Sequence, residues 1–323
     1  MKLVIQIPCL NEEQTLPATL AALPEKIAGV DEILVLIVDD GCTDGTVEVA
    51  ERFQVDAICR HRGNQGLGRA FRSGLDQALR MDADIIVNTD ADGQYNAADI
   101  PALIAPILCG EADIVVGDRQ THKNSEFGAL KKLLQRLGSH VVRALSGADI
   151  PDAVSGFRAI SRDAAMRLNI LSKFSYTIEM IIQAKNKQMK IISVPVRTHP
   201  KTRESRLFNS LPLFIAHQLA AMIRMYAMYR PMRFFFYIGC FSSLLGLLPI
   251  ARFFIAYLSG DGSGKIQSLI LGGILLTVGA IVLIAGLLAD LIAQNRQINE
   301  IALEKIRAME FQRSREEQAR TGP

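Results

Sequence analysis

Two long apolar stretches near the C-terminus place the strongest constraint on how this chain folds. Residues 234–258 are almost wholly apolar apart from Arg252, and residues 266–289 carry no formal charge. As a helix, each stretch is long enough to cross a hydrocarbon core of about 30 Å. Because only the short polar link 259–265 joins them, we predict a hairpin of two transmembrane helices. Arg252 lies in the last third of its span, from where its side chain can reach the interface.

Basic residues predict the orientation of this hairpin. Arg224, Arg230 and Arg233 precede the first span, whereas the link carries only Lys265. Five more follow the second span: Arg296, Lys305, Arg307, Arg313 and Arg315. Because cytoplasmic flanks of membrane helices are enriched in Lys and Arg, we expect both termini on the cytoplasmic side. The chain is then a multi-pass protein of the inner (cytoplasmic) membrane.

The segments beside the spans divide the rest of the chain. Residues 207–233 mix large apolar residues with few charges and predict amphipathic helices in the membrane interface. We therefore expect a cytoplasmic domain at 1–206, the membrane hairpin at 234–293 and a charged cytoplasmic tail at 294–323. In the second span, glycines recur every seven residues on one face and suit either packing inside the hairpin or a homo-oligomer contact. They are Gly272, Gly279 and Gly286.

The N-terminal half alternates short β-branched runs with helical patterns. This alternation predicts an α/β domain around a mostly parallel central sheet. Strands are expected at residues 3–7, 33–38, 57–59, 84–88, 113–116 and 191–196, and helices at residues 15–23, 46–53, 68–80, 98–108 and 129–145 and from residue 162. In such a sheet, ligands bind at the carboxyl ends of the strands.

Acidic residues follow the fourth expected strand directly. Asp90 and Asp92 lie one residue apart, so an extended chain points both to the same side, and Gln94 follows them round a turn at Gly93. Hard oxygen ligands with open coordination positions suit Mg²⁺ or Mn²⁺ that carries a substrate phosphate. The competing interpretation is an ordinary Asp-Gly turn without a metal.

Three further loops fall on the same edge of the expected sheet. Residues 8–13 follow the first strand and residues 39–46 follow the second, where Asp44 is also placed to cap a helix. Residues 60–68 are basic and glycine-rich, but their Gly-x-x-Gly-x-Gly spacing differs from the dinucleotide fingerprint. We interpret this loop as one that lies near nucleotide phosphates.

Charge and cysteine usage exclude other classes of function. The net charge of +3 gives no argument for nucleic acid. Five scattered cysteines without a Cys-x-x-Cys pair predict reduced thiols and no zinc site. The basic run at 197–206 is either a solvated face or, because membrane segments follow it, a site for an anion at the lipid surface.

Five motifs occur in order along the chain: residues 8–12 (Pro-Cys-Leu-Asn-Glu), 39–41 (Asp-Asp-Gly), 90–94 (Asp-Ala-Asp-Gly-Gln), 155–158 (Ser-Gly-Phe-Arg) and 201–207 (Lys-Thr-Arg-Glu-Ser-Arg-Leu). Together with the hairpin they resemble glycosyltransferase family 2, in its branch of polyprenyl-phosphate glycosyltransferases similar to dolichyl-phosphate mannose synthase. One departure is Cys42, which stands where Ser is more usual and is a poorer hydrogen-bond donor.

The resemblance implies a GT-A type fold and inverting transfer of one sugar from a UDP- or GDP-sugar to the phosphate of a polyprenyl phosphate. It implies that Asp90, Asp92 and Gln94 hold the metal at the donor diphosphate. Asp152 is the candidate base; it could instead orient Arg158 or Arg203. The other implied contacts are Pro8, Leu10, Glu12 and Asp39 at the nucleoside, and Arg119, Lys201 and Arg203 at the acceptor phosphate.

Two other functions remain open from the sequence. A processive membrane polysaccharide synthase is disfavoured because the chain lacks tryptophan, and with it the Gln-x-x-Arg-Trp motif of those relatives. A non-catalytic nucleotide-sugar-binding scaffold is disfavoured because both metal carboxylates are present. The sequence does not specify the sugar, the nucleotide or the polyprenol length.

Overall fold

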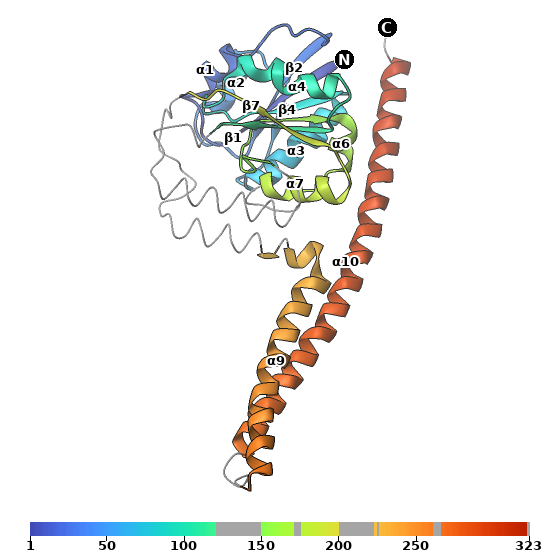
Figure 1. Cartoon of the computed structure of the whole chain (residues 1–323). Coiled ribbons are helices and arrows are strands. Elements are labelled where there is room, and N and C mark those ends of the chain that lie inside the picture. Colours follow the sequence, from blue (N-terminus) through green and yellow to red (C-terminus); the bar gives the residue numbers. More distant parts are fainter. Residues whose placement is uncertain (121–149, 171–175, 200–222, 225, 261–265, 322–323) are drawn as a thin grey trace. The chain divides into compact units, whose positions relative to one another are not determined.

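The computed structural model describes residues 1–120, 150–170, 176–199, 223–224, 226–260 and 266–321, with side chains described up to residue 311 (Figure 1). The chain divides into two compact units. The first comprises Met1–Ser205 together with Glu304–Pro323, and the second comprises Arg206–Leu303. We describe each unit by itself.

The first unit is built on a seven-stranded sheet with the order β3-β2-β1-β4-β6-β5-β7. Neighbouring strands are parallel except for β6, which runs antiparallel to both β4 and β5. The expected mostly parallel α/β sheet is therefore confirmed. Its strands are β1 (Lys2–Cys9), β2 (Glu32–Asp39), β3 (Ala57–Arg60), β4 (Ile85–Asn88), β5 (Ile114–Asp118), β6 (Arg158–Ser161) and β7 (Ile191–Pro195).

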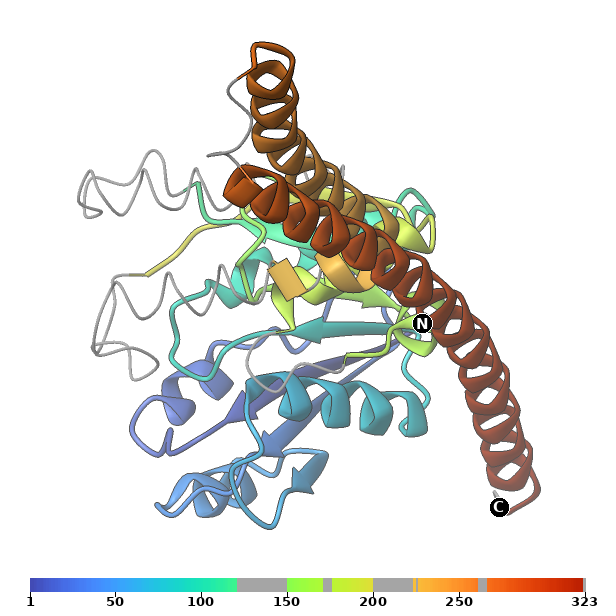
Figure 2. The same cartoon turned by 90° about the horizontal axis from the view of Figure 1, so that it is seen from below.

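Helices cover both faces of this sheet, as a parallel sheet requires. Leu3, Ile5 and Ile7 of β1 share one core with α1, α2 and α4. On the other face α3 lies close to the strands (Figure 2). The lack of a side chain at Gly74 permits this approach, since a Cβ there would lie only 2.9 Å from a methyl group of Val38. The helices of this unit are α1 (Leu16–Ala21), α2 (Thr46–Arg52), α3 (Leu67–Arg80), η1 (Ala97–Asp99), α4 (Ile100–Leu108), α6 (Arg162–Arg167) and α7 (Thr177–Asn186).

The final helix is α10 (Ile266–Thr321), and its part from Glu304 onward belongs to the first unit. Arg307 is buried, donates to the carbonyl of Leu168 at 2.9 Å and lies 3.4 Å from a carboxylate oxygen of Asp76. Glu304 pairs with Arg167 at 3.3 Å. Part of the tail that we predicted from its charge thus packs against α3 and α6.

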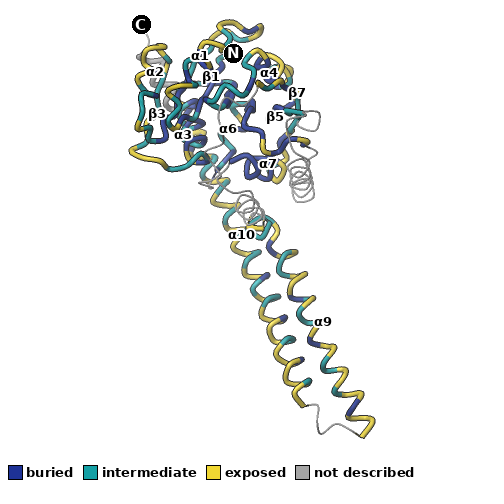
Figure 3. Tube along the Cα trace, turned by 90° about the vertical axis from the view of Figure 1, so that its left-hand side faces the viewer, coloured by how far each residue is buried: buried dark blue, intermediate teal, exposed yellow. Residues whose placement is uncertain are grey.

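The second unit contains α9 (Pro231–Leu258) and the apolar part of α10. Both helices are long and apolar enough to cross a membrane. Exposed residues run along their length (Figure 3), and most of these are large and apolar. This is the surface expected of helices that face lipid.

The glycine strip of α10 faces α9 of the same chain. A Cβ at Gly272 would lie 2.6 Å from the carbonyl oxygen of Gly246, and one at Gly279 would lie 2.9 Å from that of Gly239. One at Gly286 would meet the Cβ of Phe235 at 2.7 Å. The strip therefore serves packing inside the hairpin, the first of our two alternatives.

Two elements were not expected from the sequence, strand β6 and helix α7. Helix α10 continues without a break from the predicted span into the tail. The predicted helix at 129–145 and most of the predicted interfacial segment lie outside the described residues.

Candidate functional site

Three strand ends lie level at the carboxyl edge of the sheet. Cys9 at the end of β1 pairs with Asp39 at the end of β2, and Asp39 pairs in turn with Arg60 at the end of β3. The loops that follow these strands are therefore brought together, as the parallel order predicts. The loop after β4 belongs to the same edge because β1 also pairs in parallel with β4.

Hydrogen bonds join the first two loops. The side-chain oxygen of Asn11 accepts from the amide of Thr43 at 2.8 Å, and the Asn11 amide donates to the Cys42 sulfur at 3.2 Å. The amide of Glu12 donates to the hydroxyl of Thr46 at 2.8 Å. Asn11 has a positive φ of 57°, a conformation that asparagine tolerates better than most residues. The two loops thus form one braced surface.

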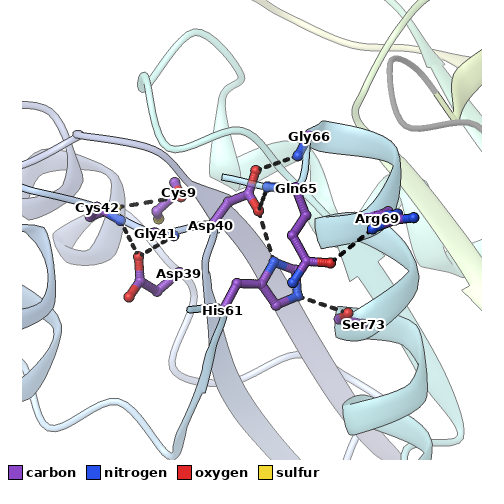
Figure 4. Close-up of polar contacts among 10 residues, drawn as sticks. All are labelled: Cys9, Asp39, Asp40, Gly41, Cys42, His61, Gln65, Gly66, Arg69 and Ser73. Atoms are coloured by element: carbon purple, nitrogen blue, oxygen red, sulfur yellow. Dashed lines mark hydrogen bonds and ion pairs between the residues drawn. The ribbon is translucent and has the colours of Figure 1, made fainter. Parts of the chain in front are cut away.

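Asp39, the expected base contact, is fixed within this surface. Its Oδ1 accepts from the amides of Gly41 and Cys42 at 3.1 and 2.7 Å (Figure 4). Leu10 is exposed, as a side chain that contacts a nucleoside must be. Cys42 remains a thiol because burial raises its pKa to about 11. Its sulfur accepts from the Asn11 amide, a bracing role within the protein.

The acidic stretch turns sooner than we expected. Strand β4 ends at Asn88, and Asp90 to Gly93 form a turn rather than an extended chain. Asp92 Oδ1 accepts from the Gln94 amide at 3.0 Å, and Gly93 has a φ of +66°. An Asp side chain that bonds the amide two residues on is typical of turns. The prediction of an extended geometry for Asp90 and Asp92 was wrong.

Burial and a neighbouring carboxylate disfavour the charged form of Asp90. Burial raises the pKa of Asp90 to about 7, the charge of Asp92 adds to the rise, and Arg119 opposes it. A Cβ added to Gly156 would lie 3.0 Å from Asp90 Oδ1, so glycine leaves the room that this carboxylate occupies.

The donor set fits a cation that is shared with a substrate. Within the described ranges, no group of three or more His, Cys, Asp or Glu side chains is arranged to hold a metal ion. A closed protein site of the zinc type is therefore not formed by these residues. Asp90 and Asp92, two nearby carboxylates, match the way Mg²⁺ is bound, by one or two carboxylates plus substrate phosphates.

Arg119 and Asp152 form a partly buried ion pair beside this stretch. Arg119 Nε and Nη2 donate to the two Asp152 oxygens at 2.7 and 3.0 Å, and Asp152 is only 1% exposed. Burial disfavours the charged guanidinium, yet Tyr95 and Asp152 raise the pKa of Arg119 above its usual range. Asp152 therefore contacts Arg119, which was neither of the two arginines we considered as its partners.

Arg158 holds the loop that carries Asp152 and Gly156. It is fully buried and donates at 2.8 Å to three backbone carbonyls, those of Ala153, Ser155 and Thr177. Burial lowers the pKa of Arg158 to about 10. The Ser-Gly-Phe-Arg motif thus contains a structural arginine.

Two tyrosines and an asparagine were missed by the sequence analysis. The Tyr95 hydroxyl accepts from the Gly156 amide at 2.9 Å, and the Asn88 amide group donates to the Gly156 carbonyl at 2.9 Å. Asn88 also donates to the Tyr176 hydroxyl at 2.8 Å, and the Tyr176 ring stacks on Phe71. Gly156 is therefore held from both sides. The only sequence signal was that Asn88 and Tyr95 flank the acidic stretch.

The start of the basic run lies against the acidic stretch. Tyr95 and Thr198 form an isolated antiparallel bridge, and the His199 amide donates to the Gln94 carbonyl at 2.9 Å. Arg197 pairs with Asp99 at 2.6 Å. Lys201 and Arg203, two predicted acceptor contacts, lie outside the described residues.

Comparison with known families gives one match. The profile described as Glycosyl transferase family 2 matches residues 4–168, about half of the chain, and this range contains the first four loops and the Ser-Gly-Phe-Arg motif. The chain belongs to glycosyltransferase family 2. It is accordingly an enzyme that transfers a sugar from a nucleotide-sugar donor.

Relatives within this family agree with the match. The UDP-N-acetylglucosamine–dolichyl-phosphate N-acetylglucosaminyltransferase of Methanococcus voltae is 32% identical over 217 residues, covering 59% of this chain and 83% of the relative. The undecaprenyl-phosphate mannosyltransferase of Micrococcus luteus is 28% identical over 206 residues, covering 61% and 83%.

Solved structures support the fold. Glucosyl-3-phosphoglycerate synthase from Mycobacterium tuberculosis, in complex with Mn²⁺, UDP-glucose and phosphoglyceric acid, superposes with a TM-score of 0.54 at 23% identity, covering 70% of this chain and 80% of that one. The fold of this family 2 member is therefore GT-A-like, as the motifs implied.

Proposed function

We propose that this enzyme transfers a single sugar from a UDP- or GDP-sugar to the phosphate of a polyprenyl phosphate, with inversion at the anomeric carbon and with a divalent cation. The observation that carries the proposal is the contact of Thr198 and His199 with Tyr95 and Gln94. Through this contact the start of the basic run, which precedes the apolar hairpin in the sequence, lies beside the acidic stretch. We therefore expect the phosphate of a lipid acceptor to lie close to the sugar donor at this point.

The names of the relatives support the class of acceptor more than the identity of the donor sugar. The names of the Methanococcus voltae and Micrococcus luteus enzymes both specify a polyprenol-type phosphate, dolichyl or undecaprenyl, as the acceptor. The same names specify different sugars. We therefore extend the acceptor class to this chain and leave the sugar open.

On the donor side, Asp90, Asp92 and Gln94 would hold Mg²⁺ or Mn²⁺. When bound, the cation supplies positive charge at the donor diphosphate. Asp39, already fixed by two backbone amides, would contact the base. Pro8, Leu10 and Glu12 would line the nucleoside.

On the acceptor side, the chain's task is to position an anion. A phosphate near neutral pH is already charged, so its attack on the anomeric carbon needs orientation more than proton removal. Arg119, with Lys201 and Arg203, would bind this phosphate. The bidentate contact of Asp152 with Arg119 supports a role for Asp152 in orienting that guanidinium rather than as a base.

The hairpin would anchor the enzyme in the membrane that contains the lipid acceptor. The two long apolar helices suggest membrane association. We propose, from the distribution of basic residues, that both termini and the catalytic unit face the cytoplasm.

The test uses the full chain in lipid nanodiscs with undecaprenyl phosphate, Mg²⁺ or Mn²⁺ and a panel of UDP- and GDP-sugars. A lipid product heavier than the acceptor by one sugar residue is expected. Asp92→Asn should lower its rate by about a hundredfold or more, because a lost electrostatic contact to developing charge has effects of this order. Asp163→Asn, on the exposed surface of α6, is the matched control.

Each alternative predicts a different product. A polysaccharide synthase yields a ladder of polymer masses. A binding scaffold yields nucleotide binding without transfer across the panel. Full activity in Asp92→Asn contradicts the cation site.

A further inference from the structure

Two consecutive aspartates, Asp39 at the end of β2 and Asp40 just after it, face different loops. Asp39 accepts from amides of its own turn, whereas Asp40 faces the glycine-rich loop after β3 (Figure 4). Asp40 Oδ1 accepts from the Gln65 amide at 2.9 Å, and Oδ2 accepts from the Gly66 amide at 2.9 Å. Asp40 is buried, with 4% of its surface exposed. Its carboxylate therefore fixes the backbone of the loop just before α3 begins.

His61 extends this contact into the helix. Its Nδ1 lies 2.8 Å from Asp40 Oδ1, and its Nε2 lies 2.9 Å from the Ser73 hydroxyl in α3. Because the carboxylate can only accept, Nδ1 carries the proton, and in the neutral ring Nε2 accepts from Ser73. The end of β2, the loop and the second turn of α3 are joined in one hydrogen-bonded chain.

The backbone of the loop is pressed against the turn after β2. Gly41 has a φ of +82°, and a Cβ there would lie 2.6 Å from the backbone of Gly63. Gly66 also has a positive φ, of 96°. Arg62 and Asn64 are exposed. The loop is therefore held at its base while its outer residues face away from the protein.

The same order of groups occurs in hydrolytic Ser-His-Asp triads. Here Ser73 lies inside α3, where backbone amides bond along the helix and do not converge on a substrate oxygen. Asp40 also shares its carboxylate with two loop amides. The arrangement is thus suited to holding a loop.

We infer that Asp40, with His61 and Ser73, is a positioning cluster that fixes the loop 61–66 as a wall of the donor nucleotide site. The inference rests on the proposed function, since it assumes a nucleotide donor beside Asp39. The loop follows β3 and packs on the turn after β2, whereas the acidic stretch follows β4, two strands away from β2. The cluster should therefore set nucleotide affinity and leave acceptor binding unchanged.

Asp40→Asn is the first variant. An amide has one accepting oxygen, so its NH₂ group faces one of the N–H donors that now meet the carboxylate. The Kd for UDP or GDP with Mn²⁺, and the donor KM, should rise about tenfold. The acceptor KM and kcat should stay within about twofold. Asp84→Asn, whose carboxylate accepts from the Lys2 amide at the opposite edge of the sheet, is the control for stability loss alone.

Two substitutions of His61 test its contacts with Asp40 and Ser73 separately. The amide nitrogen of asparagine falls near the position of Nδ1, so His61→Asn keeps the bond to Asp40. The amide of glutamine reaches the position of Nε2, so His61→Gln keeps the contact with Ser73 and loses that with Asp40. Positioning through Asp40 predicts a Kd near that of the wild type for His61→Asn and a rise of about threefold or more for His61→Gln.

Calorimetry with UDP and GDP decides the inference, and thermal unfolding monitors stability. An unchanged Kd in Asp40→Asn, or equal changes in Asp40→Asn and Asp84→Asn, would overturn it. If Asp40→Asn does not fold, equal Kd values for the two His61 variants overturn it. Failure of transfer to polyprenyl phosphate would count against the proposed function alone, because nucleotide binding is measured without acceptor.

Discussion

The two ends of the sheet fix their loops with side chains of opposite charge. On the side formed by β3, β2, β1 and β4, carboxylates accept from backbone amides, as Asp39, Asp40 and Asp92 do. On the side formed by β6, β5 and β7, guanidiniums donate: Arg158 to three carbonyls and Arg119 to Asp152.

This difference suits the two ligands of the proposed reaction. Fixed carboxylates leave negative charge where a cation and a nucleotide would bind. Guanidiniums on the other side carry positive charge near where an anionic acceptor would bind. Because both sets are held by hydrogen bonds within the protein, little reorganisation is needed when the ligands arrive, and such preorganisation is a main source of catalytic stabilisation.

The largest effect is predicted for the loss of the Arg158 guanidinium on the cationic side. Arg158→Met leaves three buried carbonyls without their donor, which should cost about 3 kcal/mol or more of the free energy of unfolding. Thermal unfolding should show a Tm lower by about 6 to 12 °C. Arg60→Ala, which removes an exposed pair with Glu51, should change Tm by much less. Equal losses would contradict the structural role of Arg158.

The second prediction tests the acidic side through pH. Since the pKa of Asp90 is raised to about 7, cation binding below pH 7 must displace a proton. The Mn²⁺ concentration that gives half of the maximal Tm rise should fall about tenfold per pH unit up to about pH 7 and then level off.

The pH dependence of stability without metal should follow the titration of the same carboxyl group, that of Asp90. Above its unfolded pKa near 4, the folded state binds this proton more tightly than the unfolded state does, so stability falls as pH rises toward 7. The difference in Tm between wild type and Asp90→Asn isolates this contribution. A difference that does not change with pH would show that Asp90 titrates normally.

The third prediction concerns the point where the two sides meet. Gly156 belongs to the loop held by Arg158, and its missing side chain leaves room for Asp90. Gly156→Ala should displace that carboxylate by a few tenths of an ångström and weaken Mn²⁺ binding about three- to tenfold. Gly110→Ala is the control, because its φ of +70° makes alanine unfavourable although the space around it is open. Unchanged Mn²⁺ binding in Gly156→Ala would argue against this contact.

The smallest effect is expected at Cys42. In Cys42→Ser, the hydroxyl oxygen can accept from the Asn11 amide as the sulfur does and is the stronger hydrogen-bonding group. The donor KM should therefore change by less than about threefold. Cys109→Ser, at an exposed position, controls for general thiol effects. A large loss of affinity would indicate that the thiol itself contacts the donor.

The sequence predicted the parts of this fold that have strong local periodicity. Six strands of the same direction and their helices follow from alternating apolar runs, and the hairpin follows from length and hydropathy. Strand β6 was missed because its four residues begin with the buried Arg158, which looks like a loop residue. Helix α7 was missed because eight of its ten residues are buried, which removes the amphipathic pattern.

The candidate site was predictable as a set of motifs but not as a set of contacts. Asp90 and Asp92 could be named from their spacing after a predicted strand, and Arg119 from the family resemblance. The pairing of Arg119 with Asp152 joins residues 33 positions apart, and no local pattern specifies it. The links of Asp40 to His61 and of Tyr95 to Gly156 arise from the same long-range packing.

The way in which the loop 61–66 is anchored has a consequence for how this enzyme can diversify. Asp40 binds the loop through backbone amides, and every residue except proline supplies such an amide. Exchanges at the exposed Arg62 and Asn64 therefore leave the anchor intact. Directed evolution of donor preference can begin at these two positions with little expected loss of folded protein.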